Sequence, residues 1–222
     1  MTGLSWRERL SALSSLGDEN RRRLYEYVCS VGAAAGRDDA AAALGMPRST
    51  ASFHLDRLVR DGLLGVEFRK PAGKGGPGSG RPAKLYVPLF AEIGVSVPER
   101  NYDLAGVVLA AAVSSAMKDG GAAREALLGT ARAKGAEAGA GGRDFLEVLA
   151  GQGYQPEADD DGGGHALLNC PFHKLSRSHP DVVCAMNGAF LAGVADACGI
   201  DGNRIAGDER PGHCCARILP GD

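Results

Sequence analysis

The cysteines of this chain most constrain what its C-terminal part can fold into. Cys170, Cys184, Cys198 and Cys214 are separated by 13, 13 and 15 residues, and Cys215 follows at once. Thiolates grouped in one segment usually bind a soft metal ion or an iron–sulfur cluster. The spacing therefore predicts a segment that folds around a metal centre.

The cellular compartment decides whether these cysteines serve metal chemistry or disulfides. No run of about 18 apolar residues is present, so no membrane-spanning helix is expected. The N-terminal sequence MTGLSWRERLSAL is charged early and lacks the apolar core of a signal peptide. We therefore expect a cytoplasmic protein, where disulfides are rare and metal or redox chemistry is favoured.

Charge is divided unevenly along the chain. Residues 1–100 contain 15 basic and 11 acidic residues, a net charge of +4, whereas residues 101–222 contain 10 and 16, a net charge of −6. Between Arg48 and Lys84 there are 8 basic and 3 acidic residues. Such a segment can contact phosphates, but a solvated surface has the same composition, so charge alone leaves both interpretations open.

Hydrophobic periodicity predicts helices over residues 4–28, 38–44 and 48–60. Asp18 interrupts the first stretch and is a suitable N-cap for a second helix within it. Pro47 suits the first turn of the helix at 48–60. The short connection between the last two helices is typical of a helix-turn-helix.

The helix at 48–60 has the composition of a DNA reader. Ala51, Leu55 and Leu58 recur on one face, and small hydroxyl residues and arginine occupy the other. This pattern fits a helix in the major groove, although an ordinary amphipathic helix also has a polar exterior. The residues expected to contact DNA from this helix are Arg48, Ser49, Thr50, Ser52, His54 and Arg57.

The segment that follows predicts a wing. Residues 63–68 and 84–88 have strand patterns, and PAGKGGPGSG between them favours no regular structure. Glycine lets such a loop follow a backbone or a minor groove, and cations at its base neutralise phosphates. The expected wing contacts are Lys70, Lys74, Arg81 and Lys84.

The sequence STASFHLDRLVRDGLL followed by GRPAKLYVP resembles the ArsR/MarR-type winged helix-turn-helix, over residues 15–90. The resemblance implies that the partner is a double-stranded DNA operator. Phe53 departs from it, because the resemblance implies a polar residue there. Two expectations stay open for Phe53, a contact with a thymine methyl group and a contact with a partner.

Residues 101–117, NYDLAGVVLAAAVSSAM, predict an apolar helix whose pattern extends past Gly120 toward Lys134. The helix is too apolar for a free surface helix. It belongs either to a domain core or to a contact with its own copy. Winged-helix regulators of the type it resembles usually dimerise through such a helix, so the resemblance implies a homodimer.

The cysteine segment contains N-C-P-F-H, H-P-D-V-V-C and a terminal C-C before a short strand. These motifs resemble the sensor domain of SufR-like iron–sulfur repressors, although the spacing does not match that family residue for residue. The resemblance implies a [4Fe-4S] or [2Fe-2S] cluster. It also implies a repressor of iron–sulfur assembly or redox genes that binds DNA when its cluster is present.

Geometry limits which cysteines can share one centre. Residues 181–197 predict one helix, along which Cys184 and Cys198 would lie about 21 Å apart at 1.5 Å per residue. Either the helix breaks at Gly188 or Gly193, or Cys198 is not a ligand. Adjacent residues of an extended chain point opposite ways, so only one of Cys214 and Cys215 is expected to face the centre. The expected ligands are Cys170, Cys184 and Cys214, with the fourth left open among Cys198, Cys215 and His173.

Other functions remain to be weighed against an iron–sulfur regulator. Cys170, His173, Cys184 and Cys214 would also form a tetrahedral zinc site, and a disulfide switch without metal is a third alternative. The sequence shows no nucleophile–base pair and no phosphate-binding loop, so we do not expect an enzyme. An iron–sulfur or zinc redox carrier is the competing class, and the predicted winged helix argues against it. Cys29 is expected to be a buried small apolar residue.

These patterns together predict an α+β chain in three parts. Residues 1–98 form a winged helix-turn-helix DNA-binding domain, and residues 99–138 form a dimerisation helix and linker. Residues 139–222 form a small α/β, cysteine-rich sensor domain that binds the metal centre.

Overall fold

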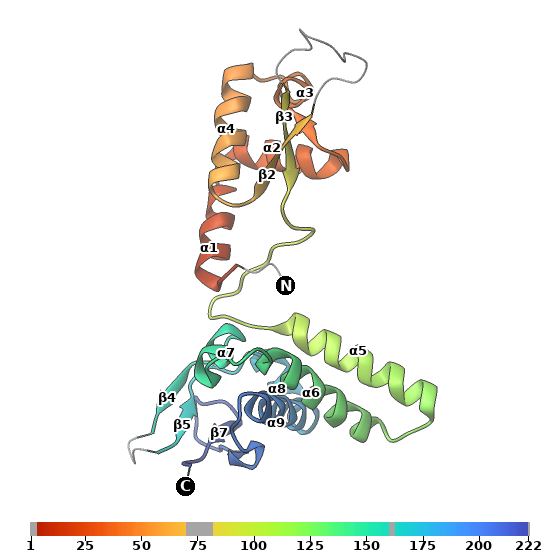
Figure 1. The fold of residues 1–222 in the computed structure, drawn as a ribbon, viewed down its shortest axis with the longest axis vertical. Coiled ribbons are helices and arrows are strands. Elements are labelled where there is room, and N and C mark those ends of the chain that lie inside the picture. Colours follow the sequence, from red (N-terminus) through yellow and green to blue (C-terminus); the bar gives the residue numbers. More distant parts are fainter. Residues whose placement is uncertain (1–3, 70–81, 160–162, 222) are drawn as a thin grey trace. The chain divides into compact units, whose positions relative to one another are not determined.

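The computed structural model describes residues 4–69, 82–159 and 163–221 (Figure 1). The chain divides into two compact units, Met1–Val95 and Ser96–Asp222. Each unit combines helices with a small antiparallel sheet, in agreement with the predicted α+β class. The wing residues Lys70, Lys74 and Arg81 lie outside the described residues.

The first unit packs helices against a small three-stranded sheet. The strand order is β1-β3-β2, and β2 pairs antiparallel with β3 from Leu64 opposite Pro88 to Arg69 opposite Ala83. The elements are α1 (Trp6–Ser15), α2 (Glu19–Val31), β1 (Ala35–Gly36), α3 (Arg37–Leu44), α4 (Arg48–Arg60), β2 (Leu64–Arg69) and β3 (Ala83–Pro88).

Local signals set the boundaries of these helices. The Asp18 carboxylate accepts a hydrogen bond from the Arg21 backbone N–H at 3.0 Å, which confirms the predicted N-cap of α2. Gly45 adopts the left-handed conformation at φ 63° and turns the chain between α3 and α4. The apolar face of α4 is fully buried against Leu24 and Tyr86, so the predicted helix-turn-helix core is present.

The second unit packs its other elements around a largely buried helix, Pro180–Ala197. Its sheet has the order β4-β5-β7-β6, with all neighbours antiparallel. The helical elements are α5 (Tyr102–Asp119), α6 (Ala123–Gly139), α7 (Phe145–Gly151), α8 (His173–Ser178), α9 (Pro180–Ala197) and the 3-10 turn η1 (Gly202–Arg204). The strands are β4 (Pro156–Ala158), β5 (His165–Leu167), β6 (Ile205–Gly207) and β7 (Ala216–Ile218).

The predicted helix from residue 101 ends earlier than its apolar pattern. Gly120 takes a left-handed φ of 65° at the C-cap of α5, and α6 begins at Ala123. The continuation toward Lys134 was therefore predicted wrongly, because two helices with a tight turn have the same composition as one long helix.

Helices α6 and α9 touch backbone to backbone, which explains the small residues on both (Figure 1). A Cβ at Gly135 of α6 would lie 2.0 Å from the Phe190 carbonyl oxygen. A Cβ at Gly193 of α9 would lie 2.1 Å from the Arg132 carbonyl oxygen. Glycine is required at both positions, since any side chain would push the helices apart.

The linking segment does not stand apart as a third region. Ala105, Val108 and Leu127 of α5 and α6 lie in the same buried core as the cysteine segment. The second unit thus begins at Ser96, whereas the sequence predicted a sensor domain from residue 139. None of the described helices combines the length and apolar character needed to cross a bilayer.

Candidate functional site

The exposed face of α4 carries part of the predicted DNA-reading set. Arg48, Ser49 and Arg57 are exposed, and Thr50 is half-buried. Phe53 lies on the same face with 66% of its surface exposed, so it is free to contact a ligand or partner. Helical spacing places Ser49, Phe53 and Arg57 in one row, which suits a helix that enters a groove.

Two of the predicted reader residues face the protein instead. The His54 side chain is 12% exposed, and its Nδ1 atom lies 3.8 Å from the Asp18 carboxylate. Ser52 is half-buried and lies close enough to the buried Tyr86 hydroxyl to lower its pKa slightly. Both lie on the side of α4 that faces the rest of the first unit. Their polar character alone does not predict this direction.

The cations of this surface are paired with carboxylates. Lys84 of β3 lies 2.5 Å from the Asp56 carboxylate, which also accepts the Tyr86 hydroxyl at 2.8 Å. Burial opposes ionisation of Asp56, but the hydrogen bonds from Lys84 and Tyr86 prevail and hold its pKa below the ordinary value. Lys84 is thus held at the base of the wing by the reader helix itself.

Four thiols from three separate segments meet inside the second unit. Cys170 lies in the loop after β5, Cys184 on α9, and Cys214 and Cys215 just before β7. Cys170 and Cys214 are buried, and the other two are half-buried. Cys170 and Cys214, Cys214 and Cys215, and Cys215 and Cys184 shift one another's pKa, so the four thiols are neighbours in that order. We call these four residues the thiol site.

Backbone hydrogen bonds bring these segments together. The Cys214 N–H donates to the Leu167 carbonyl at 2.7 Å, which holds the start of β7 beside the end of β5. The His173 N–H donates to the Cys170 carbonyl at 3.1 Å and turns the chain toward α8. The thiol site is therefore built on the sheet and on α9 together.

The thiols polarise one another. The hydrogen bond from Cys214 lowers the pKa of Cys170 to about 7 and that of Cys215 to about 6. Hydrogen bonding to Cys170 in turn raises the pKa of Cys214, and burial raises the pKa of Cys184 to about 12. Thiolate is the form that binds metals, and the contact with Cys214 favours the thiolate at Cys170 and Cys215.

Asn187 is a site residue that the sequence analysis missed. Its side chain is fully buried on α9, and its Nδ2 atom donates to Cys214 Sγ at 3.3 Å and to Cys215 Sγ at 3.6 Å. Tyr154, also buried, donates its hydroxyl to Asn187 Oδ1 at 2.5 Å. The available signal was the spacing, because Asn187 follows Cys184 by three residues on one helix.

The structure separates the candidates for a fourth ligand. Cys198 follows an unbroken α9 and contacts the Gly139 carbonyl at 3.7 Å, away from the thiol site. His173 is exposed at the start of α8. Cys215 lies in a bend just before β7 and is a neighbour of Cys214 and Cys184. The expectation that only one of Cys214 and Cys215 faces a metal centre stays a prediction.

The thiols are neighbours in a row and do not surround one point. Within the described residues, no three or more His, Cys, Asp and Glu side chains are arranged to enclose a single metal ion. Binding would require the four sulfurs to spread around the bound group. Cys29, expected to be buried, is exposed on α2.

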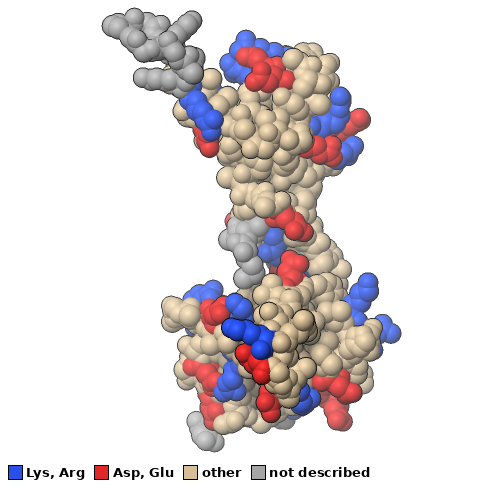
Figure 2. Space-filling model, turned by 90° about the vertical axis from the view of Figure 1, so that its right-hand side faces the viewer, with Lys and Arg blue, Asp and Glu red and all other residues tan. Residues whose placement is uncertain are grey.

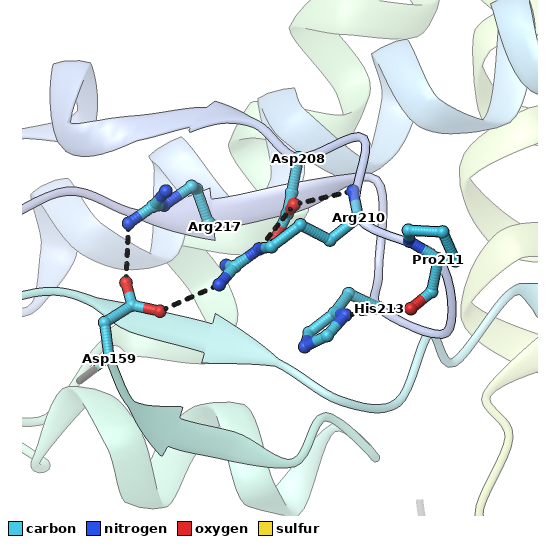
Figure 3. A network of polar contacts seen from close by, with 6 residues as sticks. All are labelled: Asp159, Asp208, Arg210, Pro211, His213 and Arg217. Atoms are coloured by element: carbon cyan, nitrogen blue, oxygen red, sulfur yellow. Dashed lines mark hydrogen bonds and ion pairs between the residues drawn. The ribbon is translucent and has the colours of Figure 1, made fainter.

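An ionic network holds the loop that carries Cys214 and Cys215 (Figure 3). The Arg210 guanidinium pairs with Asp208 at 2.7 Å and with Asp159 at 3.2 Å, and Arg217 of β7 pairs with Asp159 at 2.6 Å. The hydrogen bonds from Arg210 hold the pKa of Asp208 at about 2. The network ties residues 208–217 to the end of β4.

A second set of hydrogen bonds ties the Cys170 loop to the segment just after the unit boundary. The Arg100 guanidinium donates to the Cys170 carbonyl at 2.8 Å and to the Asn169 side chain. The Asn169 amide donates to the Glu99 carbonyl at 2.8 Å, and the Asn101 N–H donates to the Pro171 carbonyl at 3.1 Å. We call the bonds between residues 99–101 and 169–171 the latch.

Comparison with protein families identifies a helix-turn-helix domain at residues 16–67. The match covers α2 to β2 and therefore includes the reader helix. It supports a winged-helix, DNA-binding transcriptional regulator. Comparisons with curated proteins and with solved structures gave no match.

Proposed function

We propose that this protein is a transcriptional repressor, rather than an enzyme, whose operator affinity is controlled by an iron–sulfur cluster at the thiol site. The observation that carries the proposal is that Cys170, Cys184, Cys214 and Cys215, from three separate segments, lie next to one another in the core of the second unit. The donor set fits the group, because four thiolates are the ligands that iron–sulfur clusters use. The buried N–H donors of Asn187, aimed at two of the sulfurs, suit anionic ligands. A bound cluster would supply a centre that responds to oxygen, iron or redox state.

The latch supplies a physical route from the thiol site to the DNA-binding unit. Cys170 is the residue of the site that the latch holds through its own backbone carbonyl. Residues 99–101 lie a few positions after Val95, where the first unit ends. A change in the position of the Cys170 loop therefore acts on the connection between the units. Coupling between two such sites typically amounts to about 1–3 kcal/mol.

We propose further that the protein binds its operator as a homodimer. Helix α5 exposes three large apolar side chains, with 53% of Val107, 54% of Val113 and 82% of Met117 accessible. Exposed large apolar side chains grouped on one helix favour a surface that a partner covers. Sedimentation that shows only monomer at micromolar concentration would contradict the dimer.

The first experiment is anaerobic purification followed by iron, sulfide and zinc analysis. A brown protein with iron and sulfide supports the cluster, whereas a colourless protein with one zinc per chain supports a structural zinc site, which four thiolates also fit. Operator affinity is then compared between cluster-loaded and cluster-free protein by gel shift. We expect about a 5- to 150-fold weaker affinity without the cluster. Equal affinity would leave the cluster structural and refute the sensor proposal.

A further inference from the structure

We infer that Asn187 is a positioning residue of the thiol site, which sets the reduction potential of the bound cluster by donating hydrogen bonds to the sulfurs of Cys214 and Cys215. The inference rests on the proposed cluster and assigns a role to a residue that is not a ligand. It follows from where the amide lies, what fixes it and what it can donate to.

The position of Asn187 is determined by the buried helix that also carries a ligand. Asn187 lies one turn after Cys184 on α9, so both side chains project from the same face of the helix. Its side chain is fully buried, which excludes water as the usual partner for the amide. The two sulfurs at 3.3 and 3.6 Å are the acceptors available to Nδ2.

Tyr154 fixes which end of the amide faces the sulfurs. Its hydroxyl donates to Asn187 Oδ1, so the carbonyl end is occupied and the NH2 group points at Cys214 and Cys215. If the amide rotated by 180°, its carbonyl oxygen would face the sulfurs and repel thiolates. Tyr154 is 2% exposed and packed in the same core, so the orientation is built into the fold.

The hydrogen bonds from the Asn187 amide to the two sulfurs suit thiolates that act as metal ligands. Packing alone does not require an amide at this position. A neutral thiol is a weak acceptor, whereas a thiolate is a strong one. Hydrogen bonds to ligand sulfurs stabilise the more negatively charged, reduced cluster and so raise its potential. An apolar side chain would fill the same space without this effect.

The test compares two variants that differ only in the donors to sulfur. Tyr154→Phe removes the hydroxyl and keeps the Asn187 amide, whereas the double variant Tyr154→Phe/Asn187→Leu removes both polar groups and leaves no buried hydroxyl unpaired. Both variants are expected to fold and to bind the same iron and sulfide as the wild type. Circular dichroism and metal analysis check this before the potential is measured.

We expect the double variant to have a more negative reduction potential than Tyr154→Phe. A tenfold change in the ratio of oxidised to reduced cluster at a fixed potential corresponds to about 59 mV for one electron. Identical potentials and visible spectra for iron-loaded Tyr154→Phe, double variant and wild type would overturn the inference while leaving the cluster in place.

Absence of iron and sulfide from the wild type would instead refute the proposed cluster, and Asn187 is then judged by titration with Co²⁺. Weaker Co²⁺ binding by the double variant than by Tyr154→Phe would support donation to metal-bound sulfur. Equal Co²⁺ affinity of the two variants would overturn it.

Discussion

Replacing Gly135 by alanine is predicted to destabilise the second unit by separating α6 from α9. The new Cβ would lie 2.0 Å from the Phe190 carbonyl oxygen and 2.9 Å from the Val194 nitrogen. Ordinary contact needs about 3.5 Å, so the helices must move apart by about 1.5 Å. Both obstructing atoms belong to the backbone of α9, so no side-chain rotation relieves the clash.

The magnitude follows from two opposing effects. Overpacking of a core costs about 1–3 kcal/mol, and a rigid backbone contact belongs at the upper end of that range. Alanine in place of glycine inside a helix stabilises the folded state by about 0.5–1 kcal/mol. The net loss is therefore about 2 kcal/mol, or a fall in Tm of about 8 °C at about 4 °C per kcal/mol for a unit of this size.

Thermal unfolding followed by circular dichroism measures this change, and the same helix offers the control. A Cβ at Gly129 would meet nothing within 4 Å, so Gly129→Ala is expected to raise the stability by about 0.5–1 kcal/mol. Opposite shifts in Tm for the two variants would confirm the backbone contact between α6 and α9. If Gly135→Ala were as stable as Gly129→Ala, the close approach of the two helices would be wrong.

Three further predictions concern helix α4, the thiol site and the ionic network of Asp208 and Arg210. Arg57→Ala is expected to weaken binding to the specific operator by about 1–3 kcal/mol if the guanidinium contacts a base edge, and unchanged specific affinity in a gel shift would remove it from the reader set. Cys184→Ser is expected to lose iron and sulfide, because a hydroxyl is a poor ligand for soft centres. Cys198→Ser should keep both, and their loss in this variant would contradict the ligand assignment. Since the folded pKa of Asp208 is lowered to about 2, its contribution to stability is present above the unfolded pKa and lost as the pH falls toward 2. Acid titration of the unfolding free energy should therefore show a smaller loss in this range for Asp208→Asn than for the wild type, and equal losses would show that the Arg210 pair does not contribute.

The first unit was predictable because its signals are local. Asp18 marks a helix start, Pro47 marks another, and the apolar stripe of α4 is read directly from its spacing. The direction of the polar side chains outside this apolar stripe was less predictable. His54 and Ser52 are polar residues on a helix, but the elements packed around α4 decide that they face inward.

The sequence predicted which cysteines belong to the thiol site, with the fourth left open, but it did not predict how their side chains are arranged. The length of an unbroken helix was enough to question Cys198, and α9 is indeed continuous. Cys215 could not be assigned, because its direction depends on a bend formed only when β7 pairs with β5 and β6. Asn187, Tyr154 and the latch arise from contacts between residues far apart in sequence, and no periodicity records such contacts.

The ion pairs on the first unit change the salt dependence expected for DNA binding. Figure 2 shows basic and acidic side chains next to each other on the surface of this unit. The pairs at the reader helix and wing are Arg48 with Asp38 at 2.5 Å, Arg57 with Asp61 at 3.0 Å, and Lys84 with Asp56 at 2.5 Å. A cation that binds a phosphate must leave a carboxylate that stays nearby and repels the DNA. The slope of log K against log salt should therefore be shallower than the value of about 0.9 per phosphate contact expected for free cations. Asp38→Asn removes one such carboxylate, so it should raise the affinity for all DNA sequences alike and steepen the salt dependence. A gain confined to the specific operator would instead place Asp38 in base recognition and contradict this account.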